Sequence, residues 1–286
     1  MSDRNDTPSE QPRESAASAV RGLSDLRLAI SFLTRLPLPA GNLLPGSSLA
    51  ASSWAFPAIG ILIGGIGGGV FFCASQLGLG IASASLLALL SQIAVTGALH
   101  EDGLADTADG FGGGHDRSRK LEIMRDSRIG SYGVIALLLA LGLRFAAVSE
   151  LAGSLISVSD EYEQVASHTG AVFIVLITAG ALSRGGMVCL WYLLPPARAD
   201  GLSAGAGVIP IACLLIAGGS SVLVAFILLA GPAFIAATVT AVAATLCMVL
   251  LAKRQIGGQT GDVLGATQQV VEITVLLAIS AVTIAV

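Results

Sequence analysis

Charged residues are scarce in this sequence. Asp, Glu, Lys and Arg make up 12% of its 286 residues, whereas they make up about 25% of an ordinary soluble protein. Apolar residues account for 54% of the chain, and the mean hydropathy is +0.82. The composition therefore predicts an integral membrane protein.

Basic residues show no excess over acidic ones. The chain holds 15 Lys and Arg against 19 Asp and Glu, which gives a formal net charge of -4. A protein that binds DNA or RNA neutralises phosphates with clustered Lys and Arg. We therefore expect no nucleic-acid partner.

Cysteine is also rare, and its positions show neither a C-x-x-C pair nor the spacing of a secreted disulfide framework. The four cysteines all lie in apolar stretches, at Cys73, Cys189, Cys213 and Cys247. We interpret them as packing residues.

The amino-terminal segment lacks the apolar stretch of a signal peptide. Residues 1–22 are rich in Ser, Pro, Glu and Arg, so we expect them to form a disordered tail. Residues 23–36 carry apolar side chains at helical spacing among charged ones, which predicts a helix lying on the membrane surface. The remainder, 23–286, is expected to form a single transmembrane catalytic domain.

Long apolar runs dominate the rest of the chain, and a helix needs about 20 such residues to cross a bilayer. Seven runs qualify: 54–75, 81–98, 132–150, 170–193, 208–230, 232–252 and 269–286. The two runs within 208–252 are separated only at Gly231–Pro232. Glycines at 60, 64 and 68 give the first run a face on which another helix can pack closely. The sequence therefore predicts an all-α, polytopic bundle of about seven transmembrane helices.

The distribution of positive charge predicts the orientation of this bundle. Apart from Arg144 and Arg184, all Lys and Arg residues precede the first run or lie in loops that fall on the same side. Cytoplasmic loops carry this excess. We expect the amino terminus inside, the carboxyl terminus outside, and the polar loops 99–130 and 253–268 on the cytoplasmic side.

Three carboxylates occur at i, i+4 and i+7 after the second run: Asp102, Asp106 and Asp109. If the helix continues past the bilayer surface, they share one face. Their mutual repulsion would be removed by a hard divalent cation, and Mg²⁺ commonly completes its coordination with substrate phosphate oxygens. The alternative is an acidic helix face exposed to solvent.

Two further polar segments are expected on the same side. The segment 121–130 offers Arg125 and Arg128, with Lys120 just before it, and arginine forks match phosphate oxygens; ordinary positive-inside anchoring is the alternative. The glycine-rich segment 257–266 contains Asp262 as another possible metal ligand, and its backbone N–H groups are suited to an anion. A flexible connector is the alternative there.

Charges within apolar runs are costly and are usually paired or line a cavity. Arg184 is the clearest case, and we expect it to point toward the site. Arg144 and Glu272 suggest the same, with snorkelling as the alternative. His100 adjoins the acidic cluster and is a candidate base, although a lone histidine is more often structural.

The chain resembles a known family, the cobalamin 5′-phosphate synthases, also called adenosylcobinamide-GDP ribazoletransferases. The resemblance lies in FLTRLP at 32–37, HEDGLADTADG at 100–110, LEIMRDSRIG at 121–130, SRG at 183–185 and GGQTGDVLGA at 257–266. It implies a Mg²⁺-dependent, multi-pass inner-membrane enzyme. The enzyme would join adenosylcobinamide-GDP to α-ribazole or its 5′-phosphate and release GMP. The lipid bilayer would be its other partner, and the oligomeric state is left open.

The residues and the resemblance together give one set of expected site residues. The candidate metal ligands are Asp102, Asp106, Asp109 and Asp262; the candidate substrate-binding residues are Lys120, Arg125, Arg128, Gln259 and Thr260; the candidate catalytic residues are His100, Asp126 and Arg184. No role is assigned to Glu101.

The sequence is also compatible with two other functions. DTADG at 106–110 is similar to the start of the CDP-alcohol phosphotransferase signature, but the continuation of that signature is absent; a prenyltransferase is a weaker relative for the same reason. A transporter is the alternative from another class, and transporters usually bury polar groups near the bilayer midplane. Runs two, five and six contain no charge, which favours chemistry at the membrane surface.

Overall fold

The computed structural model describes residues 11–38, 47–154, 161–200 and 205–284. Regular structure in these ranges is helical, apart from one isolated bridge between Pro196 and Gln259. The elements are α1 (Gln11–Leu33), α2 (Leu49–Ser52), η1 (Ser53–Ala55), α3 (Phe56–Gln76), α4 (Ile81–Thr96), α5 (Leu99–Gly113), α6 (Arg117–Ile123), α7 (Ser131–Ser154), α8 (Glu161–Leu193), α10 (Ile211–Leu228), α11 (Gly231–Ile256) and α12 (Gly261–Ile284).

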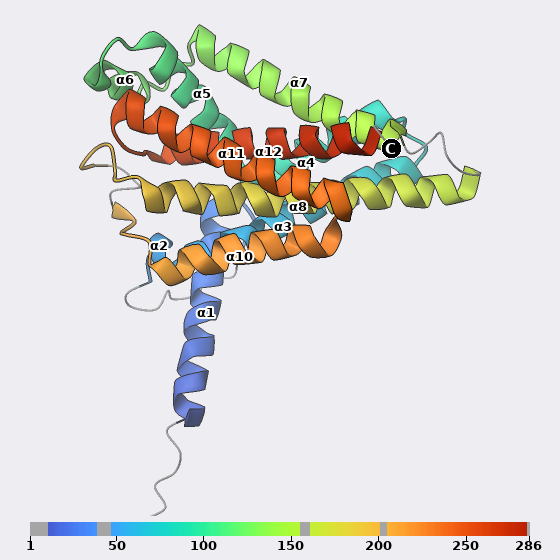
Figure 1. Cartoon of the computed structure of the whole chain (residues 1–286), viewed down its shortest axis with the longest axis horizontal. Helices are drawn as coiled ribbons and strands as arrows, with labels where there is room; N and C mark the ends of the chain where they lie inside the picture. Colours follow the sequence, from blue (N-terminus) through green and yellow to red (C-terminus); the bar gives the residue numbers. More distant parts are fainter. Residues whose placement is uncertain (1–10, 39–46, 155–160, 201–204, 285–286) are drawn as a thin grey trace, which may run out of the picture.

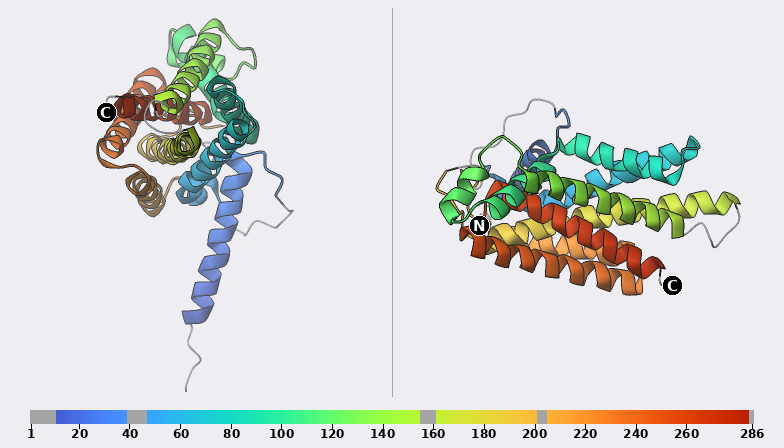
Figure 2. Two further views of the ribbon diagram at one scale, coloured as in Figure 1. Left: turned by 90° about the vertical axis from the view of Figure 1, so that its right-hand side faces the viewer. Right: turned by 90° about the horizontal axis from the view of Figure 1, so that it is seen from above.

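The long helices lie side by side as a bundle (Figures 1 and 2). Six helical segments in the described part of the chain are long and apolar enough to cross a membrane, and the bent pair of α4 and α5 adds a possible seventh. The predicted all-α membrane bundle is therefore confirmed. The turn between α10 and α11 falls at Gly231, which has a φ of +47°, and Pro232 lies in the first turn of α11; the predicted division of 208–252 is confirmed as well.

Helix α1 crosses the bundle steeply and does not run along it (Figures 1 and 2). This is the orientation expected of a helix on the membrane surface. Its buried Asp25 accepts hydrogen bonds from the Ser52 hydroxyl and from the Trp54 indole, at 3.3 and 3.4 Å. The helix already begins at Gln11, within the segment expected to be disordered, because Pro12 and the alanines that follow favour a helical start. Residues 1–10 of that segment lie outside the described part.

The second apolar run does not continue past the bilayer as one straight helix, and the three aspartates lie instead on a separate helix, α5. Helix α4 ends at Thr96, Gly97 and Ala98 adopt φ values of +65° and +58°, and α5 departs at 87°. The segment after α1 fixes this corner, because the Arg35 N–H donates to the Val95 carbonyl at 2.7 Å. We treat the apolar α4 as the membrane-spanning arm and the acidic α5 as the arm at the surface.

Helices α3 and α8 pack backbone against backbone. A Cβ atom on Gly60 would overlap the carbonyl of Gly180, one on Gly64 would overlap the carbonyl of Leu176, and one on Gly68 would lie 2.7 Å from the Phe173 Cα. The predicted glycine face is therefore confirmed. It allows α8 to lie in the centre of the bundle (Figure 2).

The last two helices are longer than their apolar runs. Helix α11 extends through Lys253 and Arg254 to Ile256, and α12 already begins at Gly261. The glycine-rich segment thus has only residues 257–260 outside helices, and Asp262 lies in the first turn of α12. The sequence does not predict these extensions, because hydropathy indicates which residues lie in the bilayer and a helix can continue beyond them through charged or glycine-rich residues.

We expect Gly64→Ala to lower the thermal stability of the detergent-purified protein. The added methyl group collides with the backbone of α8, and overpacking of this kind costs about 1–3 kcal/mol. Gly69→Ala is the matched control, because nothing lies within 4 Å of its added Cβ, and replacing a helical glycine stabilises by about 0.5–1 kcal/mol. Equal melting temperatures by circular dichroism would refute the close packing.

Candidate active site

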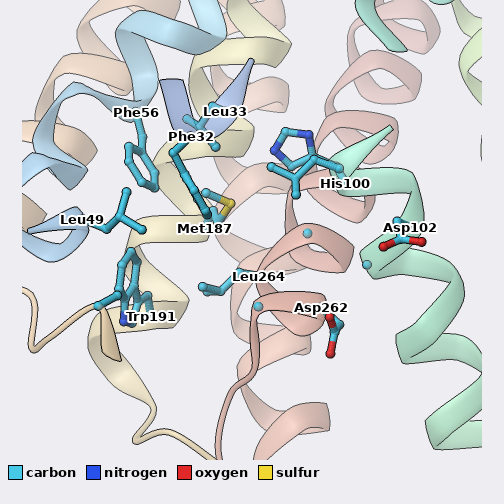
Figure 3. Close-up of a pocket in the computed structure, with 15 residues that line it drawn as sticks. Phe32, Leu33, Leu49, Phe56, His100, Asp102, Met187, Trp191, Asp262 and Leu264 are labelled. Atoms are coloured by element: carbon cyan, nitrogen blue, oxygen red, sulfur yellow. The ribbon is translucent and has the colours of Figure 1, made fainter. Parts of the chain in front are cut away.

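A cavity of about 210 Å³ lies where α1, α3, α5, α8 and α12 meet (Figure 3). One wall is apolar and includes Phe32, Phe56 and Trp191. Figure 3 shows Asp102 and Asp262 on the opposite side. The cavity therefore joins an apolar surface to a pair of carboxylates.

Helices α5 and α12 cross at two glycines, and this crossing builds the acidic side of the cavity. A Cβ on Gly103 would lie 2.7 Å from the Asp262 carbonyl oxygen, and one on Gly265 would lie 3.3 Å from the Cα of His100. The contact is therefore between backbones. It brings Asp102 and Asp262, which are 160 positions apart in the sequence, to one cavity.

The carboxylates of α5 lie in a field of like charge. Partial burial raises the pKa of Asp106 to about 7, and the neighbouring charges of Asp102, Asp262 and Asp109 add to this rise. Within the described ranges, neither Asp102 nor Asp106 has a side-chain hydrogen bond or ion pair. These two groups are therefore free to bind a cation or a donor.

Asp109, the third carboxylate of the face, is already engaged. It is buried, and its two oxygens accept hydrogen bonds from the N–H groups of Gly130 and Gly133 at 2.7 and 2.8 Å. These amides lie at the start of α7, where a helix offers unsatisfied donors. Asp109 thus ties α5 to α7, a contact that carboxylate spacing alone does not reveal.

The described residues form no closed metal cage. Among the residues that the structure describes, no three His, Cys, Asp or Glu side chains form a group that could hold a metal ion. Mg²⁺ is usually held by only one or two carboxylates together with waters and substrate phosphates. The two free carboxylates, Asp102 and Asp106, fit a metal site of that open kind.

Asp262 is held by its own neighbours. Arg198 donates to it at 2.9 Å, and the Thr260 hydroxyl donates to it at 3.1 Å. Next to Thr260, the side chain of Gln259 is fully buried, and its amide finds no hydrogen-bond partner in the described part of the chain. The segment before α12 therefore holds a paired carboxylate beside an unsatisfied amide.

The basic segment around α6 does not line this cavity. Arg125 pairs with Asp200, Lys120 pairs with Gln255, and Arg128 pairs with Asp126 at 2.7 Å. Hydrogen bonds from Arg128 lower the pKa of Asp126 to about 2. The structure thus brings two of the three predicted polar segments, the acidic one in α5 and the glycine-rich one before and within α12, to the cavity. The third, around α6, lies outside the cavity, with Arg125 and Arg128 in surface ion pairs.

Four buried charges form a network beside the cavity. Arg144 contacts Glu101 at 2.9 Å and Glu272 at 2.8 Å, and Arg184 contacts Glu272 at 2.7 Å. The four charges sum to zero, and the amide oxygens of Gln92 and Gln269 accept further hydrogen bonds from Arg144. Arg184 is therefore part of an ion network and does not line the cavity with the carboxylates.

His100 lies between the network and the cavity. It lines the cavity and also a small void of about 10 Å³ beside the four charges. Its Nε2 atom has no hydrogen-bond partner in the described ranges. Sequence reasoning missed the role of Glu101 next to it; the signal was that Arg144, inside an apolar run, needed an acidic partner.

The chain was found to be similar to one protein family over most of its length. Residues 25–280 match the family described as cobalamin-5-phosphate synthase. A relative from Mesorhizobium japonicum, named adenosylcobinamide-GDP ribazoletransferase, is 46% identical over 258 residues, which cover 90% of this chain and 93% of the relative. Relatives of the same name are 44% identical in Bradyrhizobium diazoefficiens and 42% identical in Azorhizobium caulinodans. Each alignment covers 91% of this chain, and 94% and 96% of the respective relatives. No solved structure matches the chain.

We expect Glu272→Gln to destabilise the fold strongly. The change leaves Arg144 and Arg184 short of one negative charge, and breaking a buried ion pair costs about 3–5 kcal/mol. Glu122→Gln is the control, because its pair with Arg119 is exposed and such pairs contribute about 0–1 kcal/mol. Thermal unfolding of both variants measures the difference, and similar melting temperatures would contradict a structural role for the network.

Proposed function

This chain belongs to the cobalamin-5-phosphate synthase family, and on that premise we propose that it transfers the cobinamide phosphate of adenosylcobinamide-GDP to α-ribazole or its 5′-phosphate. GMP is released, and the product is adenosylcobalamin or its 5′-phosphate. The observation that carries this proposal is the cavity inside the matched range, lined by the free carboxylate of Asp102 and the paired carboxylate of Asp262, since it offers a place where a diphosphate can meet an acceptor.

The proposed reaction forms one bond and breaks one. A ribose hydroxyl of the acceptor attacks the cobinamide-linked phosphorus, and the phosphoanhydride bond to GMP breaks. The hydroxyl proton passes to a base, for which His100 is our candidate because the residue lines the cavity and its Nε2 has no hydrogen-bond partner in the described ranges. A base within hydrogen-bond reach of the hydroxyl typically contributes about 10²–10⁴-fold to such a step.

We further propose that Asp102 and Asp106 would hold a Mg²⁺ ion, which the neighbouring charge of Asp262 would also favour. When bound, the ion would neutralise the diphosphate and the departing GMP. The support is the pair of carboxylates without partners and the like charge around Asp106. Both oxygens of Asp109 accept hydrogen bonds from the start of α7. We therefore propose that Asp109 holds α5 in place and does not bind the metal.

We place the enzyme in the inner membrane with the cavity on the cytoplasmic side. The support is the distribution of Lys and Arg, which is the usual signature of that side. Figure 1 shows α6 at the same end of the bundle as the junction between α11 and α12. Their basic residues would therefore face the compartment in which nucleotides are made.

The transporter alternative has less support from the geometry. The bundle does contain a broken helix and a buried polar network, which are features of transporters. The void beside that network, however, measures only about 10 Å³, which is roughly the space of one water molecule, and its charges pair with one another. The network therefore supports a role in holding the helices in place and not a pathway for a transported substrate.

We expect Asp102→Asn and Asp106→Asn each to lower GMP release by at least about 100-fold. The physical reason is the loss of a charge that stabilises the reacting phosphates, and the size follows other electrostatic contributions to catalysis. The assay uses purified protein, adenosylcobinamide-GDP, α-ribazole and Mg²⁺, with mass spectrometry of the product. Glu122→Gln serves as the control, because its carboxylate is exposed and lies outside the cavity.

Magnesium titrations extend this test. Any residual activity of Asp102→Asn should need more Mg²⁺ than the parent protein, and EDTA should abolish the activity of the parent. Near-normal turnover of both variants at limiting Mg²⁺ would defeat the metal assignment. A parent protein that yields no corrinoid joined to the nucleoside would instead defeat the proposed reaction.

Asp109→Asn should behave differently. An amide accepts only one of the two N–H groups of α7, so we expect a lower melting temperature, by the equivalent of about 1–3 kcal/mol. Its remaining activity should show an unchanged Mg²⁺ requirement. A shifted requirement with unchanged stability would return Asp109 to the metal.

A further inference from the structure

The cavity has an apolar half to which the proposed reaction has assigned nothing so far. Phe32, Leu49, Phe56 and Trp191 lie together on one side of it (Figure 3). The Phe56 ring centroid lies 6.3 Å from that of Phe32 and 6.4 Å from that of Trp191. We call these four side chains the aromatic wall.

We propose that the aromatic wall binds the aromatic base of the ribazole acceptor. This inference rests on the proposed function and assigns one part of one substrate to one side of the cavity. The base would lie against the rings of the wall, and the ribose would extend toward Asp102 and Asp262.

The size of the cavity favours a fragment of substrate over a whole one. Pockets that take a complete drug-sized ligand measure about 300–1,000 Å³, whereas this cavity measures about 210 Å³. That volume suits one bicyclic base, while a corrinoid macrocycle is far too large for it. The corrinoid must therefore remain outside, and only its phosphate would reach the carboxylates.

The polarity of the wall distinguishes the two bases present in the reaction. Guanine, which leaves as part of GMP, carries an exocyclic amine, a carbonyl and a ring N–H that need partners. Burying such groups unpaired is costly. The ribazole base is a dimethylbenzimidazole, with no exocyclic donor or acceptor, so an apolar wall suits it better. Guanine is then expected to lie outside this half of the cavity.

The arrangement of the cavity also matches the order of groups in the acceptor. Asp102 and Asp262 lie opposite the wall, with His100 lining the same cavity (Figure 3). A nucleoside whose base contacts the wall would direct its ribose hydroxyls toward these polar groups. Binding of the base thus positions the nucleophile, which is how enzymes convert binding into rate.

The first test separates the two substrates kinetically. We expect Trp191→Phe and Phe56→Leu to raise the KM for α-ribazole by about 5- to 10-fold, in line with the loss of an aromatic contact. The KM for adenosylcobinamide-GDP should stay within about twofold, since in the proposal it does not contact the wall. Trp54→Phe and Phe226→Leu are matched controls outside the cavity, and they should leave both constants unchanged.

The second test measures binding without turnover. The chain has two tryptophans, so Trp54→Phe protein in lipid nanodiscs reports on Trp191 alone. We expect α-ribazole to change Trp191 fluorescence at saturation, and an equal concentration of guanosine to leave it unchanged. Nanodiscs avoid free detergent, whose alkyl chain would compete for an apolar cavity.

The outcomes are distinct. A rise confined to the KM for α-ribazole, with the matching fluorescence change, supports the proposal. A rise confined to the KM for adenosylcobinamide-GDP, a response to guanosine, or no effect of either wall variant overturns it. If the parent protein forms no corrinoid product, the proposed function fails, and the fluorescence titration alone then decides whether the wall binds the nucleoside.

Discussion

The ion network of Arg144, Arg184, Glu101 and Glu272 is the constraint on which the site depends. Each charge would be expensive within a membrane domain if it stood alone, and each is paired with another that lies far away in the sequence. The network ties α5, α7, α8 and α12 to one another. Because Glu101 is the immediate neighbour of Asp102, pairing Glu101 inward fixes the rotation of α5 and turns Asp102 away from the network.

The site lies where two kinds of environment meet. Its apolar wall comes from α1, α2, α3 and α8, which continue the hydrophobic core, and its acidic side comes from the crossing of α5 and α12 (Figure 3). Neither half is sufficient for the proposed chemistry. A reaction that joins an aromatic nucleoside to a diphosphate needs both halves within one cavity, and a membrane bundle with one acidic helix at its surface supplies them.

The spans and the glycine face could be predicted from the sequence, because a span is a continuous run of apolar residues and a helix face recurs about every four residues. Sequence reasoning missed the corner at Ala98, since a left-handed non-glycine residue is unfavourable by itself and exists only where tertiary contacts such as that of Arg35 impose it. It also missed the partners of Asp109 and Glu101. Those partners are more than 20 positions away along the chain, and pairing over such a separation has no periodic signature.

The four predicted acidic ligands differ in how many hydrogen bonds they accept from the rest of the chain. Asp109 receives two backbone N–H groups and Asp262 receives Arg198 and Thr260. The described chain supplies no donor to Asp102 or Asp106, and partial burial together with repulsion from the neighbouring carboxylates raises the pKa of Asp106. In the described chain two of the four carboxylates are thus satisfied, and the other two remain available for the ligand that we propose. The i, i+4, i+7 spacing suggests three equal ligands, whereas the structure distinguishes Asp109, which is bonded to the start of α7, from Asp102 and Asp106, which we propose as the binding groups.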